Sequence, residues 1–153
     1  MDVGATTETE ITVKVIDSLY VEAMVLADDA RAYFDNFSRE EREGLGPVAR
    51  VAFSCEALKV TTRLMHVIAW LLARKAQISG EPGRAMANVS DCLGVVGHTD
   101  DITLAGLPPS ARSRIVASMD LYDRVLRLDG RLREQRQVIS PARDLMQQLA
   151  RSF

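Results

Sequence analysis

The sequence predicts an all-α protein, a three-helix bundle of long antiparallel helices, and its composition and hydrophobic spacing support this prediction. The 153-residue chain is 47% hydrophobic but only 5% aromatic, so its core must be built from aliphatic side chains. Such a core suits packed helices better than a β-sandwich. From Val48 to Ser79 there is no glycine or proline, and apolar residues recur there mostly at alternating spacings of three and four, as on an amphipathic helix. A chain of this length is expected to form one domain with a real hydrophobic core.

The N-terminal part of the chain is expected to hold a tail, a long helix and one short turn. Residues 1–11 are predicted to be a flexible polar tail, and the helical bundle domain is predicted over residues 12–137. The first helix should run from near Thr12 to Asn36, with an apolar seam made of Ile16, Leu19, Ala23, Ala27, Ala30, Phe34 and Phe37. Ser38 and Glu41 have the spacing of a capping box. They would start a short turn that ends at Gly44 or Gly46.

The second helix is the clearest element. Pro47 suits its first position, and Gly80, Pro82 and Gly83 mark its end. A helix of about 30 residues is roughly 45 Å long. Its apolar positions are Val51, Cys55, Leu58, Met65, Ala69, Leu72 and Ala76. Its polar positions share one narrow face: Glu56, Lys59, Arg63, His66, Trp70, Arg74 and Gln77. Because the other faces are largely apolar, this helix should contact at least two neighbours.

An irregular loop is expected between the second and third helices, over residues 80–108, which are rich in glycine. A short helix within this loop, over about 84–93, is compatible with the sequence. The third helix should span roughly 109–137, with apolar residues on two sides: Ile115, Met119, Tyr122 and Leu126, and Leu121, Val125, Leu128 and Leu132. Ser140 and Pro141 then predict the cap and first position of a short C-terminal helix or tail over 138–153.

Charge and cysteine content narrow the class of protein. The net charge is −2, which predicts no affinity for nucleic acid. Residues 1–46 are acidic and residues 47–90 are basic, so an acidic first helix could lie beside a basic second one, although a solvated face explains the same pattern. Cys55, on the apolar face, is expected to be buried. We expect a reducing cytoplasm, with no signal peptide and no membrane span.

No catalytic, metal or cofactor site is expected. His98, Asp100 and Asp101 lie close together with Asp91 and Cys92 nearby, but their spacing matches no metal-binding rule. His66 has no acid or cysteine beside it in a triad-like order. Paired carboxylates that are adjacent in sequence do not face the same way on a helix. These observations predict a protein that is not an enzyme.

Two groups of residues are candidate protein contacts. The first is Arg63, Trp70 and Arg74, because tryptophan and arginine dominate interface hot spots. The alternative is that residues 80–108 simply cover Trp70. The second group is Arg124, Arg127 and Arg131, a stripe suited to an acidic partner. The alternative there is helix stabilisation, since Asp120 and Asp123 stand four residues before arginines.

Two blocks of sequence resemble one known family. Thr61-Thr62-Arg63-Leu64-Met65 followed by Trp70-Leu71-Leu72 and Arg74-Lys75-Ala76 is similar to the core helix of the regulator of CtrA degradation (RcdA) family. Leu107-Pro108 followed by Leu121-Tyr122-Asp123-Arg124-Val125-Leu126-Arg127-Leu128-Asp129 resembles that family's third helix. The resemblance covers most of residues 12–135. The glycine-rich loop and the short C-terminal segment after Pro141 depart from the family's pattern.

The resemblance implies a small, cytoplasmic, α-proteobacterial bundle that dimerises and has no enzymatic activity. It would act as an adaptor that helps the ClpXP protease to take up substrates such as the cell-cycle regulator CtrA. Its partners would be a ClpX-type unfoldase, a CpdR-like protein and a PopA-like cyclic-di-GMP effector. A structural helical oligomerisation module stays open as an alternative, as does a small-molecule-responsive protein that uses the glycine-rich loop.

Overall fold

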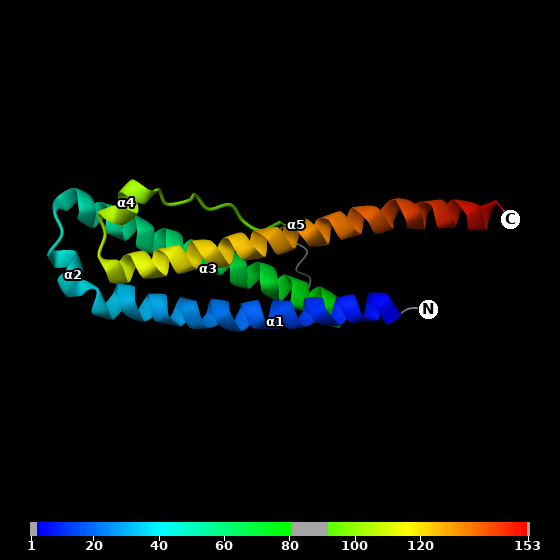
Figure 1. Ribbon diagram of the computed structural model, residues 1–153, viewed down its shortest axis with the longest axis horizontal. Helices are drawn as coiled ribbons and strands as arrows, with labels where there is room; N and C mark the ends of the chain where they lie inside the picture. Colours follow the sequence, from blue (N-terminus) through cyan, green and yellow to red (C-terminus); the bar gives the residue numbers. More distant parts are fainter. Residues whose placement is uncertain (1–2, 81–91, 153) are drawn as a thin grey trace.

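The computed structural model describes residues 3–80 and 92–152, and these residues form an all-α bundle (Figure 1). The long helices are α1 (Val3–Ala32), α3 (Pro47–Ser79) and α5 (Pro109–Arg151). A π-helical turn, η1 (Tyr33–Phe37), and two short helices, α2 (Arg39–Glu43) and α4 (Asp101–Ala105), lie between them. The described residues contain no strand, and the predicted all-α class is confirmed. The short helix expected over 84–93 falls largely outside the described residues.

The long helices do not all alternate in direction. Figure 1 shows α1 running against both α3 and α5, whereas α3 and α5 run the same way. Arg63 of α3 contacts Ser118 of α5, and Trp70 contacts Asp129, so the residue numbers rise together along both helices. The antiparallel prediction therefore holds for α1 but not for the α3–α5 pair.

The chain needs a long return segment because α3 and α5 start at the same end of the bundle. Residues 92–100, here called the strap, supply the described part of that return and run in an extended conformation (Figure 1). Gly94 lies beside His66, and Thr99 bonds to Glu56. Five extended residues span about 16 Å, and the ten helical residues from Glu56 to His66 span about 15 Å. The strap therefore runs antiparallel to α3 and covers about the same length along the bundle axis.

Both ends of the bundle differ from the sequence prediction. α1 begins at Val3, so residues 3–11, which were expected to be a flexible tail, are helical. Their side chains are mostly exposed, and local contacts such as the Thr7 hydroxyl bonded to the Val3 carbonyl (2.7 Å) support this part of the helix. At the other end, α5 continues through Pro141 to Arg151, so no separate C-terminal helix begins there. Pro141 lacks an N–H and cannot donate to the Gln137 carbonyl, and both residues are exposed to solvent.

The predicted helix boundaries around α2 and α3 are confirmed, but the capping box is wrong. Pro47 occupies the first turn of α3, and Gly80 ends the helix with a left-handed backbone (φ 63°). Ser38 has helical backbone angles, because α2 follows directly from η1, and its hydroxyl donates to the Phe34 carbonyl (2.9 Å). Glu41 instead accepts a hydrogen bond from the Tyr33 hydroxyl (2.6 Å). Burial and this contact raise the pKa of Tyr33.

The core lies along the axis shared by α1, α3 and α5, and it is largely aliphatic. Its buried apolar residues include Ile16, Leu19, Ala23, Val60, Leu64, Val67, Leu71, Ile115, Leu121 and Val125. Within the predicted seam of α1, Phe37 is the exception, because it is exposed at the end of η1. Acidic residues of α1 pair with basic residues of both other long helices, as Asp17–Lys75 (2.7 Å) and Asp29–Arg114 (3.1 Å) show. These two ion pairs agree with an acidic first helix beside basic neighbours, which is one of the two interpretations that the charge distribution left open.

Gly94 is predicted to be essential for the fit of the strap. A Cβ atom at this position would lie 2.4 Å from Nδ1 of His66 and 2.8 Å from its Cγ, so the whole ring would have to move. Gly94→Ala should lower the free energy of unfolding by about 1–3 kcal/mol, as overpacking does. Urea unfolding followed by circular dichroism measures this change.

Gly97→Ala is the matched control, because a Cβ at Gly97 meets nothing within 4 Å. It should leave the free energy of unfolding unchanged or raise it slightly, since alanine restricts the unfolded chain. Equal effects of the two substitutions would contradict the packing of the strap against His66.

Candidate protein-interaction surfaces

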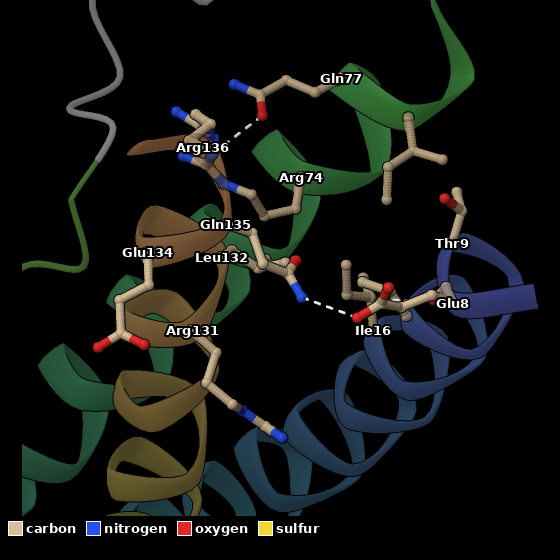
Figure 2. A pocket seen from close by; sticks show the side chains of 12 residues that line it. Glu8, Thr9, Ile16, Arg74, Gln77, Arg131, Leu132, Glu134, Gln135 and Arg136 are labelled. Carbon is tan, nitrogen blue, oxygen red and sulfur yellow. Dashed lines mark hydrogen bonds between the residues drawn. The ribbon is translucent and has the colours of Figure 1, made fainter. Parts of the chain in front are cut away.

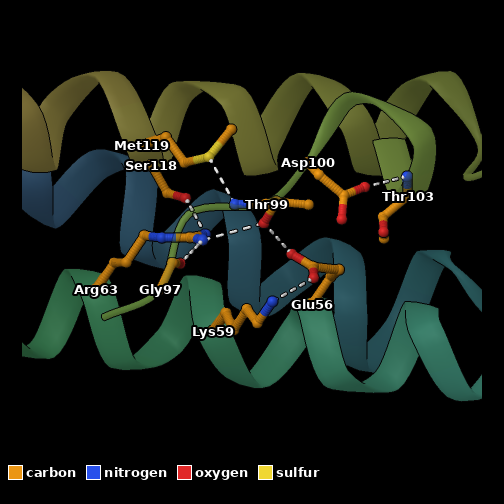
Figure 3. A network of polar contacts seen from close by, with 9 residues as sticks. All are labelled: Glu56, Lys59, Arg63, Gly97, Thr99, Asp100, Thr103, Ser118 and Met119. Atoms are coloured by element: carbon orange, nitrogen blue, oxygen red, sulfur yellow. Dashed lines mark hydrogen bonds and ion pairs between the residues drawn. The ribbon is translucent and has the colours of Figure 1, made fainter. Parts of the chain in front are cut away.

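The guanidinium of Arg63 is buried at the centre of a polar network (Figure 3). Only 1% of this residue is exposed. Its Nη2 donates to the Gly97 carbonyl (2.8 Å) and to the Thr99 hydroxyl (3.1 Å), and its Nη1 donates to the Ser118 hydroxyl (3.3 Å). Burial lowers the pKa of Arg63, while nearby Glu56 acts in the opposite direction. Arg63 therefore fastens the strap to α3 and α5 at once.

Glu56 completes this network on the opposite side of Thr99. The Thr99 hydroxyl donates to one carboxylate oxygen of Glu56, and Nζ of Lys59 lies 2.9 Å from the other. Both Glu56 and Thr99 are buried. Burying charges costs free energy unless they are paired and hydrogen-bonded, and Thr99 links the carboxylate of Glu56 to the guanidinium of Arg63. The network is therefore satisfied within the chain.

Trp70 and Arg74 are also buried inside the bundle. The indole Nε1 of Trp70 donates to Oδ1 of Asp129 on α5 (3.1 Å), and Arg133 holds the same carboxylate (2.8 Å). The guanidinium carbon of Arg74 lies 5.3 Å from the centre of the Trp70 ring, within the range of a cation–π contact. The group Arg63, Trp70 and Arg74 thus contacts α5 and the strap, and it does not form a patch on the surface of this chain. The hydrogen bond of Trp70 goes to α5 and not to the segment between α3 and α5.

The second predicted group is divided by the structure. Arg124 is bound to Glu22 of α1 (2.9 Å) and to Asp120 of its own helix (3.0 Å), and the hydrogen bond to Glu22 raises the pKa of Arg124. The ion pair that the helix-stabilisation alternative requires is therefore present between Asp120 and Arg124. Asp123, by contrast, lies 3.3 Å from His98 of the strap. Arg127 and Arg131 are exposed, so these two arginines are accessible to a partner.

The apolar positions of α3 that the spacing assigned to the core lie mostly on the surface. Val51, Leu58 and Met65 are 65%, 68% and 64% exposed. Cys55, which was expected to be buried, is exposed as well. The predicted burial of Cys55 was wrong because the strap and α5 pack against the polar side of α3 and leave the side that carries Cys55 uncovered.

We call this surface the outer α3 face. From residue 51 to residue 72 every exposed residue of α3 is uncharged: Val51, Ser54, Cys55, Leu58, Thr61, Thr62, Met65, Ala69 and Leu72. The charged residues in this stretch are Glu56, Lys59 and Arg63, which belong to the network beneath the strap. Contiguous exposed apolar residues are typical of interaction sites, so this face is a candidate contact surface. The regular spacing was visible in the sequence, but it could not show which side of the helix lacks a neighbour.

The cluster around His98 does not form a metal site. Among the described residues, no group of three or more histidine, cysteine or acidic side chains could hold a metal ion. Asp100 instead caps α4, where it accepts a hydrogen bond from the backbone N–H of Thr103 (2.7 Å) that lowers its pKa. Asp91 lies outside the described residues. No helix in the part of the chain that the structure describes is long and apolar enough to cross a membrane.

The fold defines a small all-α bundle in which a strap passes between two long helices of the same direction. The family model for "Protein of unknown function (DUF1465)" matches residues 7–153, and the chain belongs to this family. The crystal structure of RcdA from Caulobacter crescentus CB15 is similar, with a TM-score of 0.61 and 29% sequence identity. The similarity covers 76% of this chain and 90% of RcdA, and it confirms the RcdA-like family seen in the sequence. A comparison with curated proteins finds no match.

Thr99 is predicted to be the residue through which the buried charges stabilise the strap. Thr99→Val keeps the shape of the side chain but removes the hydroxyl that joins Arg63 to Glu56, so both charged groups lose a buried hydrogen bond. The free energy of unfolding should fall by about 1–3 kcal/mol, the cost of unsatisfied buried polar groups.

The matched control is Thr62→Val on the outer α3 face, where the hydroxyl is exposed and bonds only to the carbonyl of Leu58. This variant should stay within about 0.5 kcal/mol of the parent. Chemical denaturation of both variants makes the comparison, and a Thr99→Val protein as stable as Thr62→Val would show that the network contributes nothing to stability.

Proposed function

We propose that this protein is a non-enzymatic adaptor or regulatory protein of the cytoplasm that helps to deliver protein substrates to the ClpXP protease. Cell-cycle regulators such as CtrA are the proposed substrate class. The observation that carries this proposal is the similarity to RcdA, which extends over nine-tenths of that protein. The partners would be a ClpX-type unfoldase, CpdR-like and PopA-like proteins, and the substrates themselves.

Adaptor activity requires exposed contact surfaces and no covalent chemistry. Tethering a substrate near a protease makes their encounter effectively intramolecular and raises the local concentration. The chain offers Arg127 and Arg131 on α5 and, separately, the outer α3 face. The polar residues of α3 support the adaptor proposal indirectly. Their hydrogen bonds within the bundle hold the helices together, and the bundle carries these surfaces.

We further propose that the protein is a homodimer that pairs through the outer α3 face. The apolar positions Val51, Cys55, Leu58, Met65, Ala69 and Leu72 follow the spacing of a helix-pairing seam over about 32 Å. A two-fold dimer brings the same surface of each copy together. Because this face carries no exposed charge, such self-pairing buries no unpaired charge, whereas a charged partner surface would lose its hydration without compensation.

A structural helical module that only oligomerises is the second candidate. The outer α3 face favours it as much as it favours the adaptor, because the face accounts for self-association without any role in proteolysis. The two candidates differ in what the exposed arginines of α5 do. In a purely structural module, these arginines serve solubility alone.

Charge on the outer α3 face should abolish the dimer. The double variant Leu58→Lys and Met65→Lys would place four ammonium groups in the proposed interface, and the affinity between the two copies should fall by at least about a hundredfold. Sedimentation equilibrium measures this shift. Leu126→Lys, at an exposed apolar position of α5, is the control and should keep the parent's oligomeric state. A monomeric parent, or a dimeric double variant, would exclude this face as the interface.

Reversal of Arg127 and Arg131 tests the adaptor. In a reconstituted reaction with ClpXP and the CpdR-like and PopA-like proteins of the same organism, Arg127→Glu with Arg131→Glu should slow substrate degradation by about tenfold or more. Folding and oligomeric state should be unchanged. Lys14→Glu with Arg39→Glu, at exposed positions of α1 and α2, reverses the same number of charges and should leave the rate of substrate degradation at the parent's value. A parent that does not stimulate degradation would favour the structural module.

A further inference from the structure

α5 extends past the end of the helices that cover it. α3 stops at Ser79, and the Trp70–Asp129 hydrogen bond sets the register between the two parallel helices. By this register the end of α3 lies level with about residue 138 of α5. On the other side, Glu8 near the start of α1 accepts a hydrogen bond from Gln135 (3.0 Å). Residues 141–151, here called the α5 overhang, therefore project by about 16 Å (Figure 1).

The apolar seam of α5 does not stop where its neighbours stop. Within the bundle the seam contains Val125 and Leu128, which are buried, and Leu132, which is half-buried. The same spacing of three, four and seven continues through Gln135, Ala142, Met146 and Leu149 on one face of the helix. Met146 is 71% exposed and Leu149 is 52% exposed. The surface that packs on α1 and α3 is thus continuous with one that has no cover among the described residues.

A cavity of about 730 Å³ lies at the base of the overhang, where α1, α3 and α5 diverge (Figure 2). We call it the end cavity. Apolar side chains from all three helices line it, namely Ile16, Ile78 and Leu132. Its charged lining has three arginines, Arg74, Arg131 and Arg136, and two acidic residues, Glu8 and Glu134. The end cavity therefore lies beside the last turns of α3, and the overhang seam begins further along α5, beyond the end of α3.

The charge along this surface indicates the sign of its partner. Residues 130–153 contain five arginines and two acidic residues. Of the arginines, Arg133 is held by Asp129. Arg136 and Arg143 stand seven residues apart, along one flank of the seam. A second copy laid on this surface would bring arginines towards arginines, whereas an acidic helix would complement them.

We propose that the end cavity and the α5 overhang bind an amphipathic, acidic helix of a partner protein. Its apolar face would cover Met146 and Leu149 and continue the bundle where α3 stops, and its acidic flank would lie beside Arg136 and Arg143. One end of the helix would fill the end cavity against Ile78 and Leu132. This inference does not depend on the proposed role in proteolysis, because it follows from the seam, the cavity and the charge alone.

Two synthetic helical peptides test the proposal. Both carry leucine at the seam positions of three heptads, and they differ only in having glutamate or lysine at the flanking positions. Fluorescence anisotropy with the full-length chain should show binding of the glutamate peptide that weakens as salt is added, and no binding of the lysine peptide. Met146→Ser with Leu149→Ser should weaken binding by about tenfold or more. Arg136→Glu with Arg143→Glu should reverse the preference between peptides.

Gln147→Ser is the matched control, since Gln147 is exposed on the side of the helix away from the seam; it should bind like the parent. Failure of both peptides to bind, equal binding of both, or full binding by the Met146→Ser, Leu149→Ser variant would overturn the proposal. Sedimentation equilibrium adds one more outcome. If the Met146→Ser, Leu149→Ser variant differs from the parent in oligomeric state, the surface pairs with a second copy, and the acidic-partner proposal is wrong.

Discussion

The arrangement of this protein depends on one buried guanidinium, that of Arg63. Because α3 and α5 run in the same direction, the chain must return along the bundle before α5 can begin, and an extended segment cannot satisfy its own backbone groups as a helix does. Arg63 supplies a donor to the Gly97 carbonyl, and Tyr122 supplies another to the Gly94 carbonyl (2.6 Å). The strap can therefore lie against two helices without leaving these carbonyls unpaired.

This solution makes α3 differ from an ordinary amphipathic helix, because α3 buries apolar residues such as Val60, Leu64 and Leu71 in the core and a second, charged side beneath the strap. Its charged residues Glu56 and Arg63 point beneath the strap and are buried, while Leu58 and Met65 point to solvent. A buried polar network specifies position more sharply than apolar packing does, because each lost bond has a cost. The exposed residues Leu58 and Met65 belong to a third side of α3, which is available for contact with another molecule. The surface properties of the protein thus follow from how its loop is held.

Local sequence patterns predicted the helices and their ends well. The same patterns did not predict which faces of the helices are buried. Pro47 and Gly80 marked the ends of α3 because proline at a first turn and glycine at a C-cap have local causes. The exposure of Cys55 and the burial of Arg63 have a distant cause, the path of the strap, and no spacing within α3 encodes it. The acidic character of α1 left its ion pairs open, because a solvated acidic face has the same composition. Pro141 was read as a helix start, yet an exposed proline can remain inside a helix that is already formed.

The architecture also keeps the two proposed contact surfaces, the outer α3 face and the α5 overhang, apart from each other. The outer α3 face is uncharged and lies along the middle of the bundle, whereas the overhang seam is flanked by Arg136 and Arg143 and lies beyond the end of α3. Surfaces of such different charge select different partners, because a partner that suits one would leave charges unpaired on the other. The packing of α3 against α5 joins them, so two occupants would be held at a fixed separation. Tethering of this kind raises effective concentration most when the spacing between sites is fixed to match the span of the partners.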